Sequence, residues 1–184
     1  MTKRLSDSEN IVIKEIFQNP QSSLVEIAEV LEKAKDRQTR KSDKKVDVRT
    51  VSKFKSVGLK KIKEGLEDLA DTLRLDRSVQ GETKEEIERE KAKAELLLRN
   101  GILIGHDFRI DREVYLFYTV KDQNILPWQD HLCNRNCEED CTRILRTVQS
   151  DHGLKESTTH EIRGQFKKSI EEIIEKTMDE KKNE

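Results

Sequence analysis

Apolar residues recur at helical spacing along most of this 184-residue chain. Leu24, Ile27 and Leu31 repeat at steps of three and four, which is typical of a helix with one buried face. An earlier helix is predicted to begin at an N-cap at Ser8 and to end before Pro20. Three later helices are predicted over residues 84–99, about 129–148 and about 157–178. The chain is therefore expected to be mainly α-helical.

A longer helix is predicted from Val48, and it ends in a regular aliphatic seam. The seam alternates steps of three and four at Leu59, Ile62, Leu66, Leu69 and Leu73. Such spacing is typical of coiled-coil packing. The seam can be covered by the 84–98 helix or the C-terminal helix of the same chain, or by a second copy of the chain. We expect the second copy, and hence a homodimer, because several long amphipathic helices need partners.

The hydrophobic period changes to two after Gly101. Apolar and polar residues alternate over 102–110 and 114–120, with a turn near Asp111-Arg112. Alternation of this kind predicts a β-hairpin. The expected fold class is mainly α with one β-hairpin.

Composition limits the size of the core and the location of the protein. Hydrophobic residues make up 33% of the chain and charged residues 40%, against roughly 45–50% and 25% in average domains. No apolar run approaches the ~18 residues of a membrane span, and the N-terminus has no apolar secretory segment. The three cysteines are an odd number within one short segment, which fits a reducing compartment. A cytoplasmic protein without a membrane partner is expected.

Positive charge is concentrated in one part of the sequence. Residues 33–63 contain thirteen Lys and Arg but only three Asp and Glu, whereas the whole chain has a net charge of −1. Solvated charge runs are common, but ordinary surfaces mix the two signs. Segregation on this scale favours a surface that meets a polyanion.

Three helices followed by a hairpin is the element order of a winged-helix domain. The segment 96–105 (LLLRNGILIG) resembles the junction between recognition helix and wing in winged-helix transcriptional regulators of bacteria and archaea. These include the leucine-responsive feast/famine and the multiple-antibiotic-resistance types. Residues 24–31 resemble their second helix, and residues 48–53 resemble the start of their recognition helix.

The resemblance implies a division of the chain into two units. A winged helix-turn-helix DNA-binding domain would span residues 8–120, with long, coiled-coil-like helices beside it. Residues 60–99 depart from the family pattern and would be an inserted helical segment. A helical dimerisation or sensing region would follow over 126–178, and a disordered tail over 179–184.

The resemblance also implies individual DNA contacts. Residues at the start of the recognition helix would face base edges or nearby phosphates: Arg49, Thr50, Ser52 and Lys53. The lysines that follow would contact the backbone: Lys55, Lys60, Lys61 and Lys63. His106, Arg109 and Arg112 would lie in the wing and reach a flanking minor groove. Arginine suits bidentate contact with guanine, whereas lysine meets phosphate mainly as a point charge.

A second group of candidate residues follows the hairpin. Its members are His131, Cys133, Cys137 and Cys141. Thiolates and imidazole suit zinc or an iron–sulfur cluster, and the gaps between the cysteines fit zinc-site spacing. If one helix spans 129–148, the three sulfurs share one of its faces, which Leu145 and Val148 continue. Plain packing of the cysteines as small apolar residues is therefore the competing interpretation.

Together these features predict a dimeric regulator of transcription that binds double-stranded DNA. One alternative is a helical coiled-coil adaptor that binds an acidic protein or RNA. Another is a cysteine-based metal or redox sensor. The sequence has no glycine-rich phosphate loop and no nucleophile elbow, and an enzyme is not expected.

Overall fold

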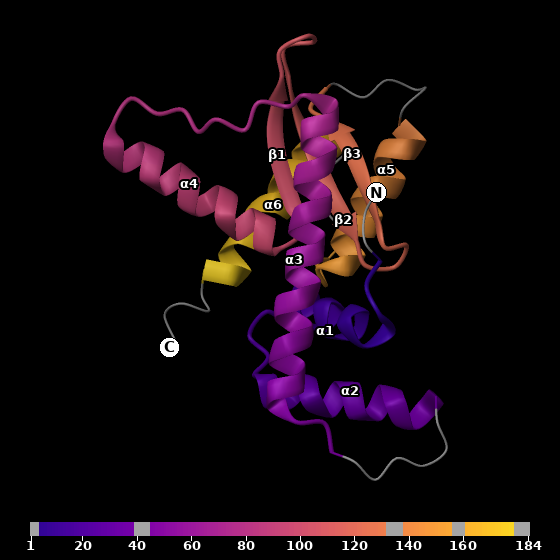
Figure 1. Ribbon diagram of the computed structural model, residues 1–184. Coiled ribbons are helices and arrows are strands. Elements are labelled where there is room, and N and C mark those ends of the chain that lie inside the picture. Colours follow the sequence, from indigo (N-terminus) through magenta and orange to yellow (C-terminus); the bar gives the residue numbers. More distant parts are fainter. Residues whose placement is uncertain (1–3, 39–44, 132–137, 156–160, 179–184) are drawn as a thin grey trace.

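The computed structural model describes residues 4–38, 45–131, 138–155 and 161–178 (Figure 1). The elements are α1 (Asp7–Gln18), α2 (Leu24–Gln38), α3 (Val48–Leu73), α4 (Lys84–Arg99), β1 (Ile102–Asp107), β2 (Arg112–Thr119), β3 (Asn124–Gln129), α5 (Glu138–Asp151) and α6 (Ile162–Met178). The strands form one antiparallel sheet in the order β1-β2-β3. The prediction of a mainly helical chain with a hairpin is confirmed at this level.

The third strand corrects the prediction of a single hairpin. β3 pairs with β2, Leu116 lying opposite Pro127, and the expected helix over 129–148 begins only at Glu138. Proline lacks a backbone donor, so Pro127 made a strand here less expected from the sequence. Proline is nevertheless tolerated on an edge strand such as β3. Ile125 and Trp128 are buried in different core clusters, so β3 lacks the simple alternation of a half-exposed strand.

One face of the sheet is covered by α3, and α1 adds side chains to the same core. Leu116 and Tyr118 of β2 belong to the same cluster as Phe17 of α1 and Ile62 and Leu66 of α3. The predicted aliphatic seam therefore lies in a core of its own chain, where the half-buried Leu59, Leu69 and Leu73 adjoin this cluster. The sequence suggested that another helix of the chain or a second copy of the chain would cover the seam. The sheet was not among these expected partners, and coiled-coil packing is not confirmed.

The other face of the sheet is covered by α5 and α6. Tyr115 and Phe117 of β2 share a cluster with Trp128 of β3 and Phe166 of α6. Phe166 stacks on Trp128 with ring centroids 4.1 Å apart. β2 is thus buried on both faces, and β3 contributes to cores on both sides of the sheet.

The three N-terminal helices form a separate corner. α1 and α2 lie across one half of α3 (Figure 1), and Val12, Ile27, Leu31 and Val51 make a small core between them. The N-cap of α1 is Ser6, whose hydroxyl accepts from the Glu9 backbone, and this corrects the prediction of Ser8. α2 runs from Leu24 to Gln38.

Helix α4 projects from the body and is attached by its C-terminal end (Figure 1). Leu96 and Leu97 are buried, whereas most residues before them are exposed. The predicted start and end of this helix are confirmed: Thr83 and Glu86 form a capping box, and Gly101 follows with φ +72°. In the part of the chain that the structure describes, no helix is long and apolar enough to cross a bilayer.

Candidate functional site

The first half of α3 carries most of the predicted DNA-binding residues. Its N-cap is Asp47, which accepts a hydrogen bond of 3.0 Å from the Arg49 backbone. From Val48 to Lys63 the sequence has six Lys and Arg and no acidic residue. Positive charge in this half is therefore not interrupted by carboxylates on the same segment.

Five of the predicted residues lie along one exposed face of this helix, here called the basic stripe. Its members are Arg49, Ser52, Lys53, Lys60 and Lys63, all exposed. At about 100° per residue they fall within roughly a quarter to a third of the helix circumference. The opposite side is occupied by Val51 and Ile62, which are buried in the helical corner and beneath the sheet respectively. The stripe spans about 21 Å along the axis.

The cations differ in how far carboxylates engage them. Lys60 and Lys63 each lie 3.8 Å from a half-buried glutamate one turn later, an arrangement that contributes at most a few tenths of a kcal/mol. Arg49, Lys53 and the exposed Lys55 beside the stripe make no ion pair with any residue that the structure describes. These three cations remain available to an external anion.

Lys61 is separated from the stripe by its place on the helix. Its Nζ lies 2.7 Å from Oε2 of Glu9, whose side chain is only 8% exposed. Although burial opposes the shift, hydrogen bonds from Lys61 and the Ser6 backbone hold the pKa of Glu9 below its ordinary value. Lys61 therefore joins α3 to α1 and does not lie on the exposed stripe. Thr50 is half-buried and also lies off it.

The hairpin residues lie at the other end of α3. Nη2 of Arg109 donates to the Leu73 carbonyl at 3.0 Å and contacts Asp107 at 2.6 Å. Arg49 precedes Leu73 by 24 residues in the same helix, or about 36 Å. Arg112 is exposed beside this hairpin turn. The structure does not bring the predicted wing contacts and the basic stripe together on one small surface.

His106 also points into local contacts. Its Nε2 lies 3.2 Å from Asp111 Oδ1 across the hairpin turn, and its backbone pairs with Asp76. These contacts connect the hairpin to the segment after α3. They give His106 a structural part in the fold that its sequence position did not indicate.

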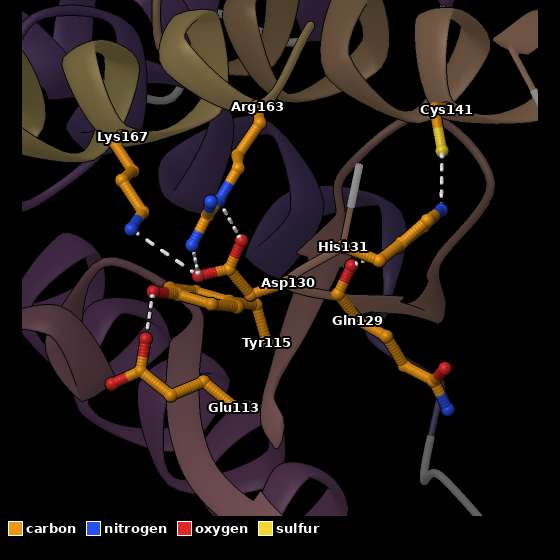
Figure 2. Close-up of polar contacts among 8 residues, drawn as sticks. All are labelled: Glu113, Tyr115, Gln129, Asp130, His131, Cys141, Arg163 and Lys167. Atoms are coloured by element: carbon orange, nitrogen blue, oxygen red, sulfur yellow. Dashed lines mark hydrogen bonds and ion pairs between the residues drawn. The ribbon is translucent and has the colours of Figure 1, made fainter. Parts of the chain in front are cut away.

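Two of the four candidate metal ligands are described by the structure, and they face one another. Figure 2 shows His131, after β3, directed toward Cys141 in the first turns of α5. Nε2 of His131 lies 4.0 Å from Sγ of Cys141, and Cys141 is buried. Cys133 and Cys137 lie outside the described residues. The described residues hold no cluster of three or more His, Cys, Asp or Glu suited to a metal.

A neighbouring ion cluster was not anticipated from the sequence. Asp130 is hydrogen-bonded by Arg163 and lies 3.2 Å from Lys167, both on α6 (Figure 2). The hydrogen bond from Arg163 is the largest of the effects that lower the pKa of Asp130. Thirty-three residues separate Asp130 from Arg163, and no local spacing signals such a pair.

Tyr115 and Glu113 complete this polar region. The Tyr115 hydroxyl donates to Glu113 Oε2 at 2.8 Å (Figure 2). Burial, with the nearby carboxylate, raises the pKa of Tyr115, so the phenol stays protonated at neutral pH. The region is a stabilising network at the junction of β2, β3 and α6.

Comparison with known proteins adds no further constraint. No family model, no curated protein and no solved structure matches this chain. Functional conclusions must therefore rest on the geometry of the chain itself.

Proposed function

We propose that this protein is a DNA-binding protein of the transcription-regulator type, and that the first half of α3 is its DNA-contacting helix. The observation that supports this proposal is the basic stripe: exposed cations on one face of a helix segment that contains no acidic residue. A charge pattern of this kind attracts a polyanion. A surface without a partner would not require it.

The dimensions of the stripe suit double-stranded DNA. The major groove is about 12 Å wide and admits one α-helix, and a helix segment of about 21 Å follows it over several base pairs. Arg49 and Ser52 near the N-terminus of α3 are suited to base edges. Lys60 and Lys63 further along are suited to phosphates.

The helical corner supports such a docking. α1 and α2 pack on the buried side of α3 through Val12, Ile27 and Val51, and the basic stripe lies on the side opposite Val51. In helix-turn-helix proteins a first helix likewise holds the recognition helix from behind while its outer face meets the groove. The segment between α2 and α3 is longer here than the usual turn.

A salt titration of DNA binding tests the proposal. Fluorescence anisotropy with a labelled mixed-sequence duplex should give a Kd that rises steeply between 50 and 200 mM salt, by roughly 100-fold if four phosphates are neutralised. Single-stranded RNA and a polyglutamate peptide serve as competitors of the other candidate classes. Binding that is independent of salt, or RNA bound more tightly than duplex DNA, would overturn the assignment.

The homodimer remains a prediction from the sequence. The seam that suggested it lies against the sheet of its own chain, so this seam gives no support for a dimer. Sedimentation of the full chain with and without DNA decides the point. Two copies on a palindromic duplex would present the two α3 helices about 34–36 Å apart.

A further inference from the structure

The connection between β3 and α5 brings a histidine and a cysteine into contact range from separate elements. His131 follows directly on β3 and Cys141 lies in α5, ten residues later. Neither residue belongs to the basic stripe, and the proposed DNA binding uses neither. The pair therefore needs an explanation of its own.

The orientation of the His131 ring is set by a backbone contact. Its Nδ1 contacts the Gln129 carbonyl oxygen, and because a carbonyl can only accept, Nδ1 must carry the proton. In the neutral ring Nε2 is then the nitrogen with the lone pair, and Nε2 faces Sγ of Cys141 (Figure 2). A hydrogen bond from the other ring nitrogen to a carbonyl is the usual support of a metal-binding histidine.

The distance between the two atoms fits a shared metal ion. Zinc bonds of about 2.3 Å to sulfur and 2.0–2.1 Å to nitrogen, at a tetrahedral angle, separate S and N by about 3.5–3.6 Å. The observed separation is 4.0 Å. A side-chain adjustment of about half an ångström would bring both atoms to bonding distance of one ion.

The backbone that carries His131 is held firmly before any ion binds. The Asp130 side chain is bound by Arg163 and Lys167 of α6, and its backbone N–H donates to the Glu113 carbonyl of β2 at 2.9 Å. Trp128 is stacked on Phe166. Pre-positioned ligands lower the ordering cost of binding an ion.

We propose that Zn²⁺ binds between β3 and α5 as a structural ion, with His131 Nε2 and Cys141 Sγ as two of its ligands. Four-coordinate structural zinc takes its other ligands from the same small set of side chains, most often cysteine thiolates. The nearest such residues in the sequence are Cys133, two positions after His131, and Cys137, four positions before Cys141. Both lie outside the described residues and enter here through the sequence alone.

The two described ligands come from different elements. On a single helix over 129–148, one ion would have to bind residues spaced by four along a rigid face. His131 follows directly on β3, which ends at Gln129, and Cys141 lies in α5, so these two ligands do not share one helix face. His131 then supplies a ligand from a strand end, and Cys141 supplies one from a helix.

Metal analysis of the full-length protein tests the proposal. Protein purified under reducing conditions should contain about one zinc per chain, and chelation should lower its Tm by several degrees, because only the folded chain holds the ion. Replacing zinc with cobalt(II) should give the visible absorption of a tetrahedral thiolate site. Protein that neither contains zinc nor takes up zinc or cobalt after reduction would overturn the proposal.

Single substitutions then assign the ligands. His131→Ala and Cys141→Ser should each reduce zinc affinity at least tenfold, while His106→Ala, a histidine at the hairpin turn, should leave zinc content unchanged. Full zinc affinity in either of the first two variants would overturn its assignment as a ligand. Zinc lost in Cys133→Ser and Cys137→Ser supports a closed four-ligand site, and zinc retained in both contradicts one. Far-UV circular dichroism of each variant shows whether the fold persists, and the metal content of the unmodified chain is decisive by itself.

Discussion

The first half of α3 and the helix α4 are both charged and exposed, yet their charges are arranged differently. Between Val48 and Lys63, α3 has six cations and no carboxylate, whereas α4 has five cations and five carboxylates. On α4 the two signs pair locally: Lys91 lies 3.1 Å from Glu88, and Lys93 lies 3.9 Å from Glu90. The cations of the two helices therefore have different partners.

The comparison shows that the arrangement of charges on a helix, and not only their number, determines what the charges can do. Pairs three or four residues apart stabilise an exposed helix by a few tenths of a kcal/mol each, and they leave little field at a distance. Charges of one sign on one face add up to a field that reaches a partner. The pairs on the projecting helix α4 can stabilise that helix slightly, while the basic stripe of α3 is suited to steering a polyanion.

Charge reversal on the two helices should have the largest effect. We expect Arg49→Glu with Lys53→Glu to weaken duplex DNA binding at least 100-fold, because two cations are replaced by charges that repel phosphate. Lys91→Glu with Lys93→Glu changes the net charge equally and should weaken binding by less than about threefold. Anisotropy titrations at one salt concentration measure both.

The same pair of variants also reports on folding. A glutamate at position 49 lies in the first turn of α3, where the helix dipole favours negative charge. The Tm of the α3 variant should therefore not fall. Equal losses of affinity in the two double variants would mean that net charge, and not the basic stripe, governs binding.

The part of the fold that sequence could predict is the part with local signals. The bounds of α4 follow from the capping residues Thr83 and Glu86 and from Gly101. The seam from Leu59 to Leu73 showed correctly that this face of α3 is buried, but periodicity does not say against what. Its covering by β2 depends on residues forty or more positions away, which no local pattern encodes.

The candidate site also has a part that the sequence could predict and a part that it could not. Exposed cations on one helix face can be read from the sequence, because an amphipathic period fixes which face is buried. The exclusion of Lys61 depends on Glu9, 52 residues earlier, and the support of His131 depends on Arg163 of α6. Such tertiary partners become known only when the elements are placed together.

The pH dependence of folding stability gives a second test, which involves neither α3 nor α4. Burial, aided by the charge of Lys176, lowers the pKa of His152 to about 3, and its ring stacks on Phe17 at 4.9 Å. The unfolded chain binds a proton near pH 6.5, so stability is present above that pH and is lost as the pH falls toward 3. Between pH 7 and 5 the loss should be about 2 kcal/mol.

His152→Phe removes this titration while keeping an aromatic ring beside Phe17. Urea unfolding at pH 7 and pH 5 should show a smaller pH effect in the variant, by about 2 kcal/mol. DNA affinity at pH 7 should be unchanged, which separates loss of fold from loss of the basic stripe. An identical pH slope in both proteins would contradict the buried neutral imidazole.

Two neighbouring lysines of α3 sharpen the comparison within one helix. Lys61→Met breaks the contact with the buried carboxylate of Glu9 and should cost about 1–2 kcal/mol of stability at pH 7. Because the pKa of Glu9 is lowered in the folded state, this difference should shrink as the pH falls below about 4. Lys63→Met should leave stability within about 0.5 kcal/mol and weaken DNA binding instead. Urea unfolding and anisotropy together distinguish the two lysines, and the opposite assignment of effects would show that Lys61 is the residue that meets DNA.

The smallest expected effect concerns the kind of contact that one cation makes. Lys60 has an exposed side chain 3.8 Å from Glu64, and we expect it to neutralise one phosphate without reading a base. Lys60→Ala should weaken several unrelated duplexes alike, by about threefold, and reduce the slope of log K against log salt by about 0.9. Lys84→Ala at the start of α4 should change neither quantity. A loss that varies from one duplex sequence to another would place Lys60 against base edges, and the division of α3 into a base-reading start and a phosphate-binding continuation would then be wrong.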